Sequence, residues 1–136
     1  MSTKLFANLP VKDLKRSMDF FSKLGFTFNP QFTDENAACM VISEENYAML
    51  IVPDFFKNFT VKEIADAAKT TEVILSLTAD SREKVDEMIG KAIQAGGKES
   101  KFSQDLGWMY ERGFSDLDGH MWEFFYMDES AVPQNK

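Results

Sequence analysis

The pattern of apolar and polar positions predicts a strand, a helix and three further strands in the first half of the chain. Apolar residues recur at helical spacing after Asp13, whose carboxylate is suited to cap the first turn of a helix, and Gly25 ends this pattern. Ser17 is a polar gap in the apolar stripe. The strands are expected at short apolar runs: Leu5–Leu9, Phe26–Phe28, Ala37–Ile42 and Tyr47–Val52.

The second half repeats this order with different residues. Asp80 and Glu83 have the spacing of a capping box, and the apolar face of a longer helix follows, up to Gly96. Residues 116–119, Asp-Leu-Asp-Gly, predict a hairpin turn between the last two strands. The strands are expected at Val73–Leu77, Lys98–Phe102, Trp108–Phe114 and Met121–Met127. The repeated order predicts an α+β fold built from two βαβββ modules.

A segment of different character separates the two halves. Within Pro53–Lys69, Thr60 and Glu63 have capping-box spacing and predict one short helix. We therefore expect a single domain over residues 1–136, with modules at about 1–53 and 71–128, a linker at about 54–70, and a polar tail at 129–136. A generic α+β sandwich without a significant cleft is the alternative.

Composition and charge exclude several classes of partner. The chain has 136 residues, of which 44% are hydrophobic and 27% charged, an ordinary globular balance. The net charge of −7 opposes binding to nucleic acid or to a membrane surface. The longest apolar runs are too short to cross a bilayer, and the start of the chain lacks the pattern of a signal peptide. A single cysteine, Cys39, cannot form an internal disulfide, so we expect a cytoplasmic protein.

Two motifs carry a resemblance to a known superfamily. The opening segment Leu9–Leu14, followed by Ser17, Phe20-Phe21 and Leu24–Phe26, resembles the start of the vicinal oxygen chelate superfamily. The segment Asp116–Glu123 resembles its closing D-x-D-G-x-x-W-E motif. That superfamily includes glyoxalase I, the bleomycin-resistance proteins and the extradiol dioxygenases. The resemblance implies a glyoxalase-like curved sheet, mixed but mostly antiparallel, around a cup that is usually completed by dimerisation or domain pairing.

The resemblance also implies where a divalent metal would be held in the enzymes of the superfamily. Ligands come from the first and last strands of each half. The first-strand ligand lies seven positions before the helix-capping acid, which gives Phe6 from Asp13 and Val73 from Asp80. The last-strand carboxylate of the closing motif corresponds to Glu123, and matching residues 45–47 with residues 118–120 places its first-half counterpart at Leu50. Three of these four side chains are hydrocarbon, whereas a divalent metal needs three or four N, O or S donors. We therefore expect no metal centre of the family type and no cofactor.

Other donors do not replace the missing ligands. The only histidine, His120, shares strand parity with Trp122 rather than with Glu123, which indicates a structural or surface role. Glu72 lies one residue from Val73, and a shift of one residue turns a side chain to the other sheet face. Cys39 lies in an apolar strand, where an inert buried thiol is expected.

Glu123 is the candidate catalytic residue, and it has two interpretations. In an apolar cup its carboxylate is suited to act as an acid or base or to bind a cation; alternatively it bonds neighbouring groups as a structural residue. Asn8 shares strand parity with Phe6. Trp108, Tyr110 and Arg112 share one face of the penultimate strand, and Met109 and Glu111 share the other. The pattern leaves open which of these two faces lines the cup. The candidate ligand-binding residues are Phe6, Asn8, Leu50, Val73, Trp108, Tyr110, Arg112, Met121 and Glu123.

Three functions follow from these features. The first is a homodimeric binding protein of the bleomycin-resistance type, whose apolar cup takes a cationic or neutral aromatic small molecule. The second is a glyoxalase-like lyase or isomerase, or a dioxygenase, that uses Glu123 with an atypical metal set or as a proton shuttle. The third is a scaffold whose cup is filled by its own side chains.

Overall fold

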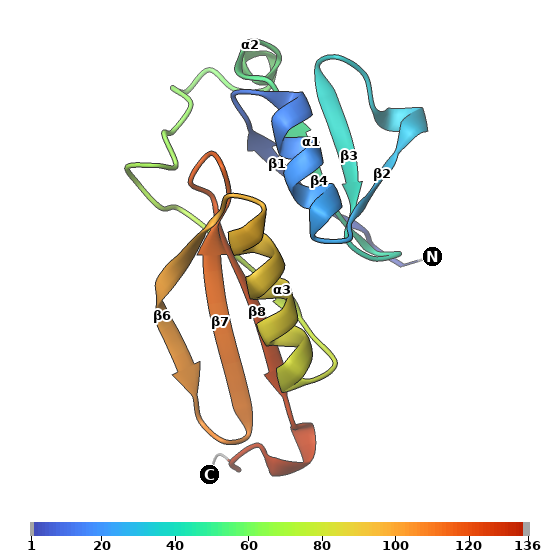
Figure 1. The fold of residues 1–136 in the computed structure, drawn as a ribbon. Coiled ribbons are helices and arrows are strands. Elements are labelled where there is room, and N and C mark those ends of the chain that lie inside the picture. Colours follow the sequence, from blue (N-terminus) through green and yellow to red (C-terminus); the bar gives the residue numbers. More distant parts are fainter. Residues whose placement is uncertain (1, 135–136) are drawn as a thin grey trace. The chain divides into compact units, whose positions relative to one another are not determined.

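The computed structural model describes residues 2–134 and divides into two compact units, Met1–Asp66 and Ala67–Lys136. Each unit consists of a four-stranded mixed sheet and a helix that packs on one of its faces (Figure 1). The α+β fold of two βαβββ modules that the sequence predicts is confirmed. Among the described residues, no helix is long and apolar enough to span a membrane.

The first unit has the strand order β1-β4-β3-β2. Strand β1 runs parallel to β4, whereas β3 pairs antiparallel with both β4 and β2. The elements of this unit are β1 (Leu5–Pro10), α1 (Leu14–Lys23), β2 (Thr27–Asn29), a 3-10 turn (Pro30–Phe32), β3 (Ala37–Val41), β4 (Asn46–Ile51), α2 (Pro53–Phe56) and a second 3-10 turn (Lys57–Phe59).

Helix α1 begins where the sequence predicts. The carboxylate of Asp13 accepts a hydrogen bond from the amide of Arg16 at 3.1 Å, and Gly25 follows the helix at φ +103°. Its buried face is Leu14, Ser17, Phe20 and Phe21. Ser17, the polar gap in the expected stripe, is therefore buried, whereas Met18 is only half-buried.

The second unit has the equivalent strand order, β5-β8-β7-β6, with β5 parallel to β8. Its elements are β5 (Ile74–Thr78), α3 (Arg82–Gln94), β6 (Lys98–Asp105), β7 (Met109–Ser115), β8 (Met121–Met127) and a 3-10 turn (Glu129–Ala131). The core between α3 and the sheet contains Trp122, Phe114 and Phe124, whose rings are stacked with centroids 6.1–6.5 Å apart.

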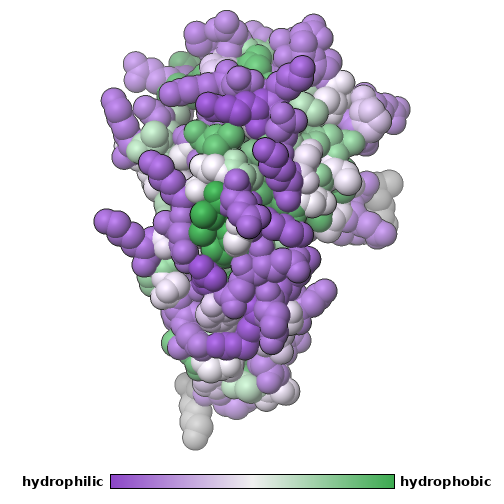
Figure 2. Space-filling model, in the orientation of Figure 1, coloured by the Kyte–Doolittle hydropathy of each residue, from purple (hydrophilic) through white to green (hydrophobic). Residues whose placement is uncertain are grey.

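The face of the molecule visible in Figure 2 is mainly hydrophilic with small apolar patches, as the charged composition predicts.

Two details differ from the sequence prediction. The N-cap of α3 is Ser81, whose hydroxyl accepts a hydrogen bond from the amide of Lys84 at 3.0 Å, and not Asp80. In the linker, Thr60 caps no helix: its hydroxyl accepts from the amide of Lys62, and the short helix α2 lies earlier, directly after β4. Proline at the first position of α2 suits a helix start, because that position needs no amide hydrogen.

Candidate functional site

The face of the second sheet that is turned away from α3, here called the distal face, is defined by register. Residues paired across neighbouring strands point to the same face, and alternate residues along a strand point to opposite faces. One row across β5, β8 and β7 is Ser76, Glu123 and Gly113. The rows on either side are Ile74, Met121 and Ser115, and Thr78, Phe125 and Glu111.

Glu123 is held in place on this face by its neighbour on β5. The hydroxyl of Ser76 donates a hydrogen bond to Oε1 of Glu123 at 2.6 Å. Such a charge-assisted bond restricts the rotamers of the carboxylate and leaves its second oxygen for another partner. Ser76 is therefore a functional candidate that the sequence pattern did not single out, because alternation counted from Val73 places it on the opposite face.

Gly113 lies on β7 directly opposite Glu123, where neighbouring atoms leave no room for a side chain. A Cβ at this position would lie 3.0 Å from the carbonyl oxygen of Trp122 and 3.4 Å from Cγ of Glu123. Both contacts are tight, so a larger residue would press on the strand and on the Glu123 side chain. Gly113, which is itself buried, is therefore required for the close packing of β7 against β8 beside Glu123.

A second carboxylate, Glu111, lies on the same face one row from Glu123. Burial raises the pKa of Glu111, and the negative charge of Glu123 raises it further. The distal face therefore carries two acidic groups that repel each other, and a cation placed near both would relieve this repulsion.

Tyr110 and Arg112 lie on the opposite face, under α3. The hydroxyl of Tyr110 donates to Asp86 of α3 at 2.6 Å, and Arg112 forms ion pairs with Asp86 at 2.8 Å and Glu99 at 2.6 Å. Of the two alternatives for this strand, Glu111 and Met109 share the face of Glu123. The candidate residues Tyr110 and Arg112 therefore do not share the face of Glu123. Trp108 precedes β7, and its backbone carbonyl accepts from the amide of Asp128.

The ion pairs around Arg112 tie α3 to the sheet rather than forming a binding site. Burial acts to lower the pKa of Arg112, but its hydrogen bonds to Glu99 and Asp86 raise it well above its usual value. Hydrogen bonds from Tyr110 and Arg112 lower the pKa of Asp86. These groups are satisfied by one another, which leaves little of their hydrogen-bonding capacity for a ligand.

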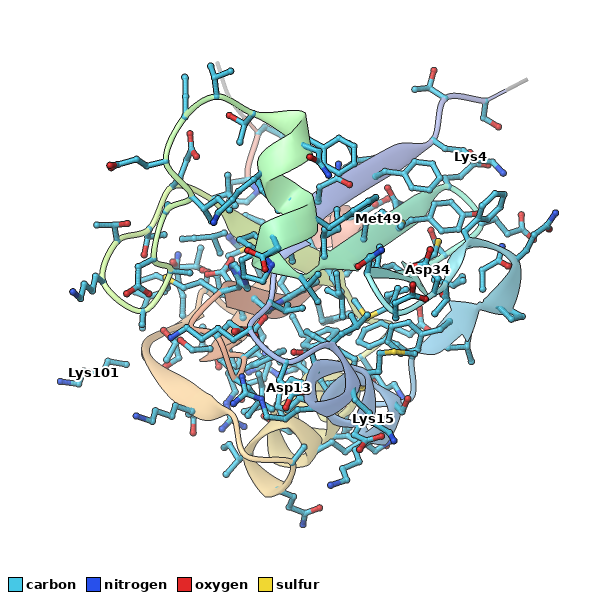
Figure 3. All side chains as sticks on the ribbon, turned by 90° about the horizontal axis from the view of Figure 1, so that it is seen from above. Lys4, Asp13, Lys15, Asp34, Met49 and Lys101 are labelled. Carbon is cyan, nitrogen blue, oxygen red and sulfur yellow. The ribbon has the colours of Figure 1, made fainter. Side chains whose placement is uncertain are left out.

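In the first sheet, the distal face is the one turned away from α1. Phe6 pairs with Tyr47, and Asn8 pairs with Met49. Figure 3 shows Lys4 and Met49 on the side of the sheet away from the helix that carries Lys15. Leu50 points the other way and is fully buried with Ala38, its register partner. The prediction that Leu50 shares a face with Phe6 is therefore wrong, and Met49 takes its place.

Val73 requires a similar correction. It precedes β5 and is 53% exposed, while the next residue, Ile74, occupies the strand on the distal face. The displacement has the same origin as the shift of the N-cap, because seven residues before Ser81 is Ile74, just as seven residues before Asp13 is Phe6. Phe6 and Ile74 are thus equivalent, as are Met49 and Glu123.

These positions can be tested against the metal centre that the resemblance implies. The four equivalent side chains, Phe6, Met49, Ile74 and Glu123, offer one carboxylate and one thioether. Across residues 2–134, no group of three His, Cys, Asp or Glu side chains is arranged to hold a metal ion. A divalent metal requires more hard or borderline donors, so this set does not fit the family-type centre.

The residues of the closing motif serve the turn between β7 and β8. Asp116, which is buried, accepts hydrogen bonds from the amides of Asp118 and His120 and from the indole of Trp122, each at 3.0 Å. Burial raises the pKa of Asp116, although His120 and the hydrogen bond from Trp122 act in the opposite direction. His120 thus belongs to a structural turn. Cys39 is also buried, which raises the pKa of its thiol and makes it unreactive.

Comparisons with known proteins agree with this architecture. Residues 3–43 match the family model described as bleomycin resistance protein-like N-terminal. No curated protein matches the sequence. The hypothetical protein SA1046 from S. aureus is 30% identical, with 93% of this chain and 95% of that one covered and a TM-score of 0.77.

Two further structures have the same fold at lower identity. A glyoxalase/bleomycin resistance protein/dioxygenase family enzyme from Burkholderia phytofirmans PsJN is 14% identical, with 93% of this chain and 99% of that one covered and a TM-score of 0.76. TnmS3, an antibiotic binding protein from Streptomyces sp. CB03234, is 16% identical, with 93% and 97% covered and a TM-score of 0.66. The first 43 residues thus resemble the bleomycin-resistance family, and the whole chain has the fold of proteins described as glyoxalase, bleomycin resistance protein or dioxygenase.

Proposed function

We propose that this protein binds a small cationic or neutral organic molecule, without a metal, on the distal face of the second sheet. The observation that carries the proposal is the Glu123 carboxylate, oriented by Ser76 at 2.6 Å on a face that also carries Glu111. Two nearby carboxylates attract a positive group, and the net charge of −7 adds a long-range field of the same sign.

Several features of this face suit a small organic ligand. Ile74, Met121 and Phe125 supply apolar surface around the carboxylates. Apolar walls with a few oriented polar groups are typical of small-molecule sites. The same fold in TnmS3, an antibiotic binding protein, is compatible with a binding role for this one.

A thermal-shift experiment with matched variants tests the proposal. The probes are metal-free bleomycin, which is a cationic glycopeptide, and a cationic planar dye. A ligand at a hundred times its Kd stabilises the protein by about 2.7 kcal/mol. We expect a rise in Tm with at least one probe, which Glu123→Gln abolishes and Glu44→Gln preserves, since Glu44 is an exposed carboxylate outside the face. If no probe raises Tm, or Glu123→Gln responds like the wild type, the proposal is wrong.

The raised pKa of Glu111 favours a second candidate function, a lyase or isomerase that moves a proton between substrate atoms. In this case Glu123, positioned by Ser76, takes the proton and Glu111 supplies one. A Glu123→Gln variant with full turnover would exclude this function. A dioxygenase or metal-dependent version would require an atypical donor set, and elemental analysis showing less than about a tenth of a metal ion per chain would exclude it.

We further propose that residues 1–136 act as one cytoplasmic domain that functions as a homodimer. Exposed apolar side chains at the first strands of both sheets support self-association, among them Leu5 at 63% and Val73 at 53%. Light scattering gives the mass in solution. A mass of one chain at all accessible concentrations would contradict the dimer, and a Val73→Lys variant is expected to shift the equilibrium towards monomer.

A further inference from the structure

Two aromatic rings are stacked on the distal face of the first sheet. Phe6 of β1 and Tyr47 of β4 are register partners, and their ring centroids lie 4.6 Å apart with an angle of 11° between the planes. This spacing is at the short end of the range for offset-stacked rings in proteins. The two side chains therefore form a stack of two nearly parallel rings.

Hydrogen bonding and charge fix this pair before any ligand arrives. The hydroxyl of Tyr47 donates to the backbone carbonyl of Glu44 at 2.9 Å, and Nζ of Lys4 lies 5.6 Å from the centre of the Tyr47 ring. The parallel pairing of β1 and β4 holds the backbone on both sides. Because the rings are already ordered, a ligand that stacks on them loses little side-chain entropy.

The pair is also accessible. Phe6 is 47% exposed, which is high for an aromatic residue in a sheet, and β1 is the edge strand of its sheet. One side of the Phe6 ring contacts Tyr47, and no further strand of this sheet lies beyond β1. Asn8, exposed on the same face two residues further along β1, offers an amide next to the rings.

We infer that Phe6 and Tyr47 are a stacking platform for a planar aromatic molecule. A third ring laid against the side of the Phe6 ring that faces away from Tyr47 extends the existing stack. A saturated ring of the same size gains contact area but no ring–ring stacking. The inference goes beyond the proposed function, since it shares no residue with the carboxylate face of the second unit.

The experiment compares 2-naphthol with decahydro-2-naphthol, which has the same carbon skeleton but no planar ring system. Binding is followed by NMR titration of the isotope-labelled full chain. We expect 2-naphthol to shift resonances of Phe6, Tyr47 and Asn8 and to bind about tenfold more tightly than its saturated analogue. Phe6→Leu is expected to weaken 2-naphthol by about fivefold, whereas Phe6→Trp retains it.

Control variants separate this inference from its alternatives. Phe32→Leu removes an exposed phenylalanine outside the stack, at 60% exposure, and is expected to leave binding unchanged. Glu123→Gln is also expected to leave it unchanged, so the platform and the carboxylate site succeed or fail separately. Equal binding of the two naphthols, shifts that are confined to other residues, or unchanged affinity in a folded Phe6→Leu variant would overturn the inference. So would a Phe6→Leu effect on self-association alone, which would identify the rings as a contact between copies.

Discussion

The indole nitrogen of Trp122 donates a hydrogen bond to Oδ2 of Asp116, at 3.0 Å and away from solvent. The other carboxylate oxygen accepts from the amides of Asp118 and His120, so one aspartate organises both the turn and the core tryptophan. The closing motif of the sequence is therefore a structural device in this protein. It secures the start of β8 and thereby the placement of Glu123, one residue beyond Trp122.

We predict that Asp116→Ala lowers the free energy of unfolding by about 2–4 kcal/mol, because three donors lose their acceptor and one of them is buried. Urea denaturation measures the change. Asp54→Ala, which removes an aspartate whose side chain is 97% exposed, is the control and is expected to change stability by less than about 0.5 kcal/mol. An Asp116→Ala variant as stable as this control would contradict the structural role.

Gly119 lies in the same turn at φ +93°, and an added Cβ would be 2.8 Å from Cα and from N of Ala68. We predict that Gly119→Ala is clearly more destabilising than Gly107→Ala. Gly107 has a similar φ of +83° but open space around it, so it isolates the backbone cost of about 1 kcal/mol from the steric clash. Similar Tm values for the two variants would show that residues 67–68 can move away.

Acid is expected to weaken the attachment of α3 to its sheet. The pKa of Asp86 is lowered by the hydrogen bond from Tyr110 and by Arg112, so the folded state binds this proton less readily than the unfolded state. Its stabilising contribution is present above the unfolded-state pKa of about 3.9 and is lost as pH falls through the lower folded-state pKa. We predict that the wild type has a higher Tm than Asp86→Asn at pH 6 and that this difference in Tm becomes smaller towards pH 2. A difference in Tm that does not depend on pH would contradict the lowered pKa of Asp86.

The opposite pH dependence is expected for Glu111. Burial and the charge of Glu123 raise its pKa, so its favourable contribution exists at low pH and is lost as pH rises through the raised folded-state value. We predict that Glu111→Gln is more stable than the wild type at pH 8, with a smaller difference at pH 4. Carbon-detected NMR should also show a fall in the pKa of Glu111 in Glu123→Gln. An unchanged pKa of Glu111 in this variant would contradict the electrostatic interaction between the two carboxylates.

Much of the fold could be predicted from local pattern. Asp13 caps α1 as expected, because an aspartate before an apolar helical stripe and a glycine after it leave few alternatives. The cap of α3 was displaced by one residue, since Asp80 and Ser81 are both good capping residues. In the structure Ser81 is the N-cap, because its backbone is extended, with φ of −158° and ψ of 165°, as an N-cap requires.

That single-residue displacement explains part of the error in the candidate site. Counting from Asp80 selected Val73 instead of Ile74, and a one-residue error in matching the halves selected Leu50 instead of Met49. In a strand, one residue is the difference between the two faces. Motif spacing alone could not resolve this, because register is set by pairing with a distant strand.

The sequence by itself determined the repeated βαβββ order and the scarcity of metal donors, since these depend on which residues are present and on local periodicity. Tertiary structure alone decided which carboxylates and aromatic rings meet. Ser76 reaches Glu123, and Phe6 reaches Tyr47, through parallel strand pairs that join residues about forty or more positions apart. Such contacts depend on register and on the face that each helix covers, and these are properties of the folded sheet rather than of any local segment.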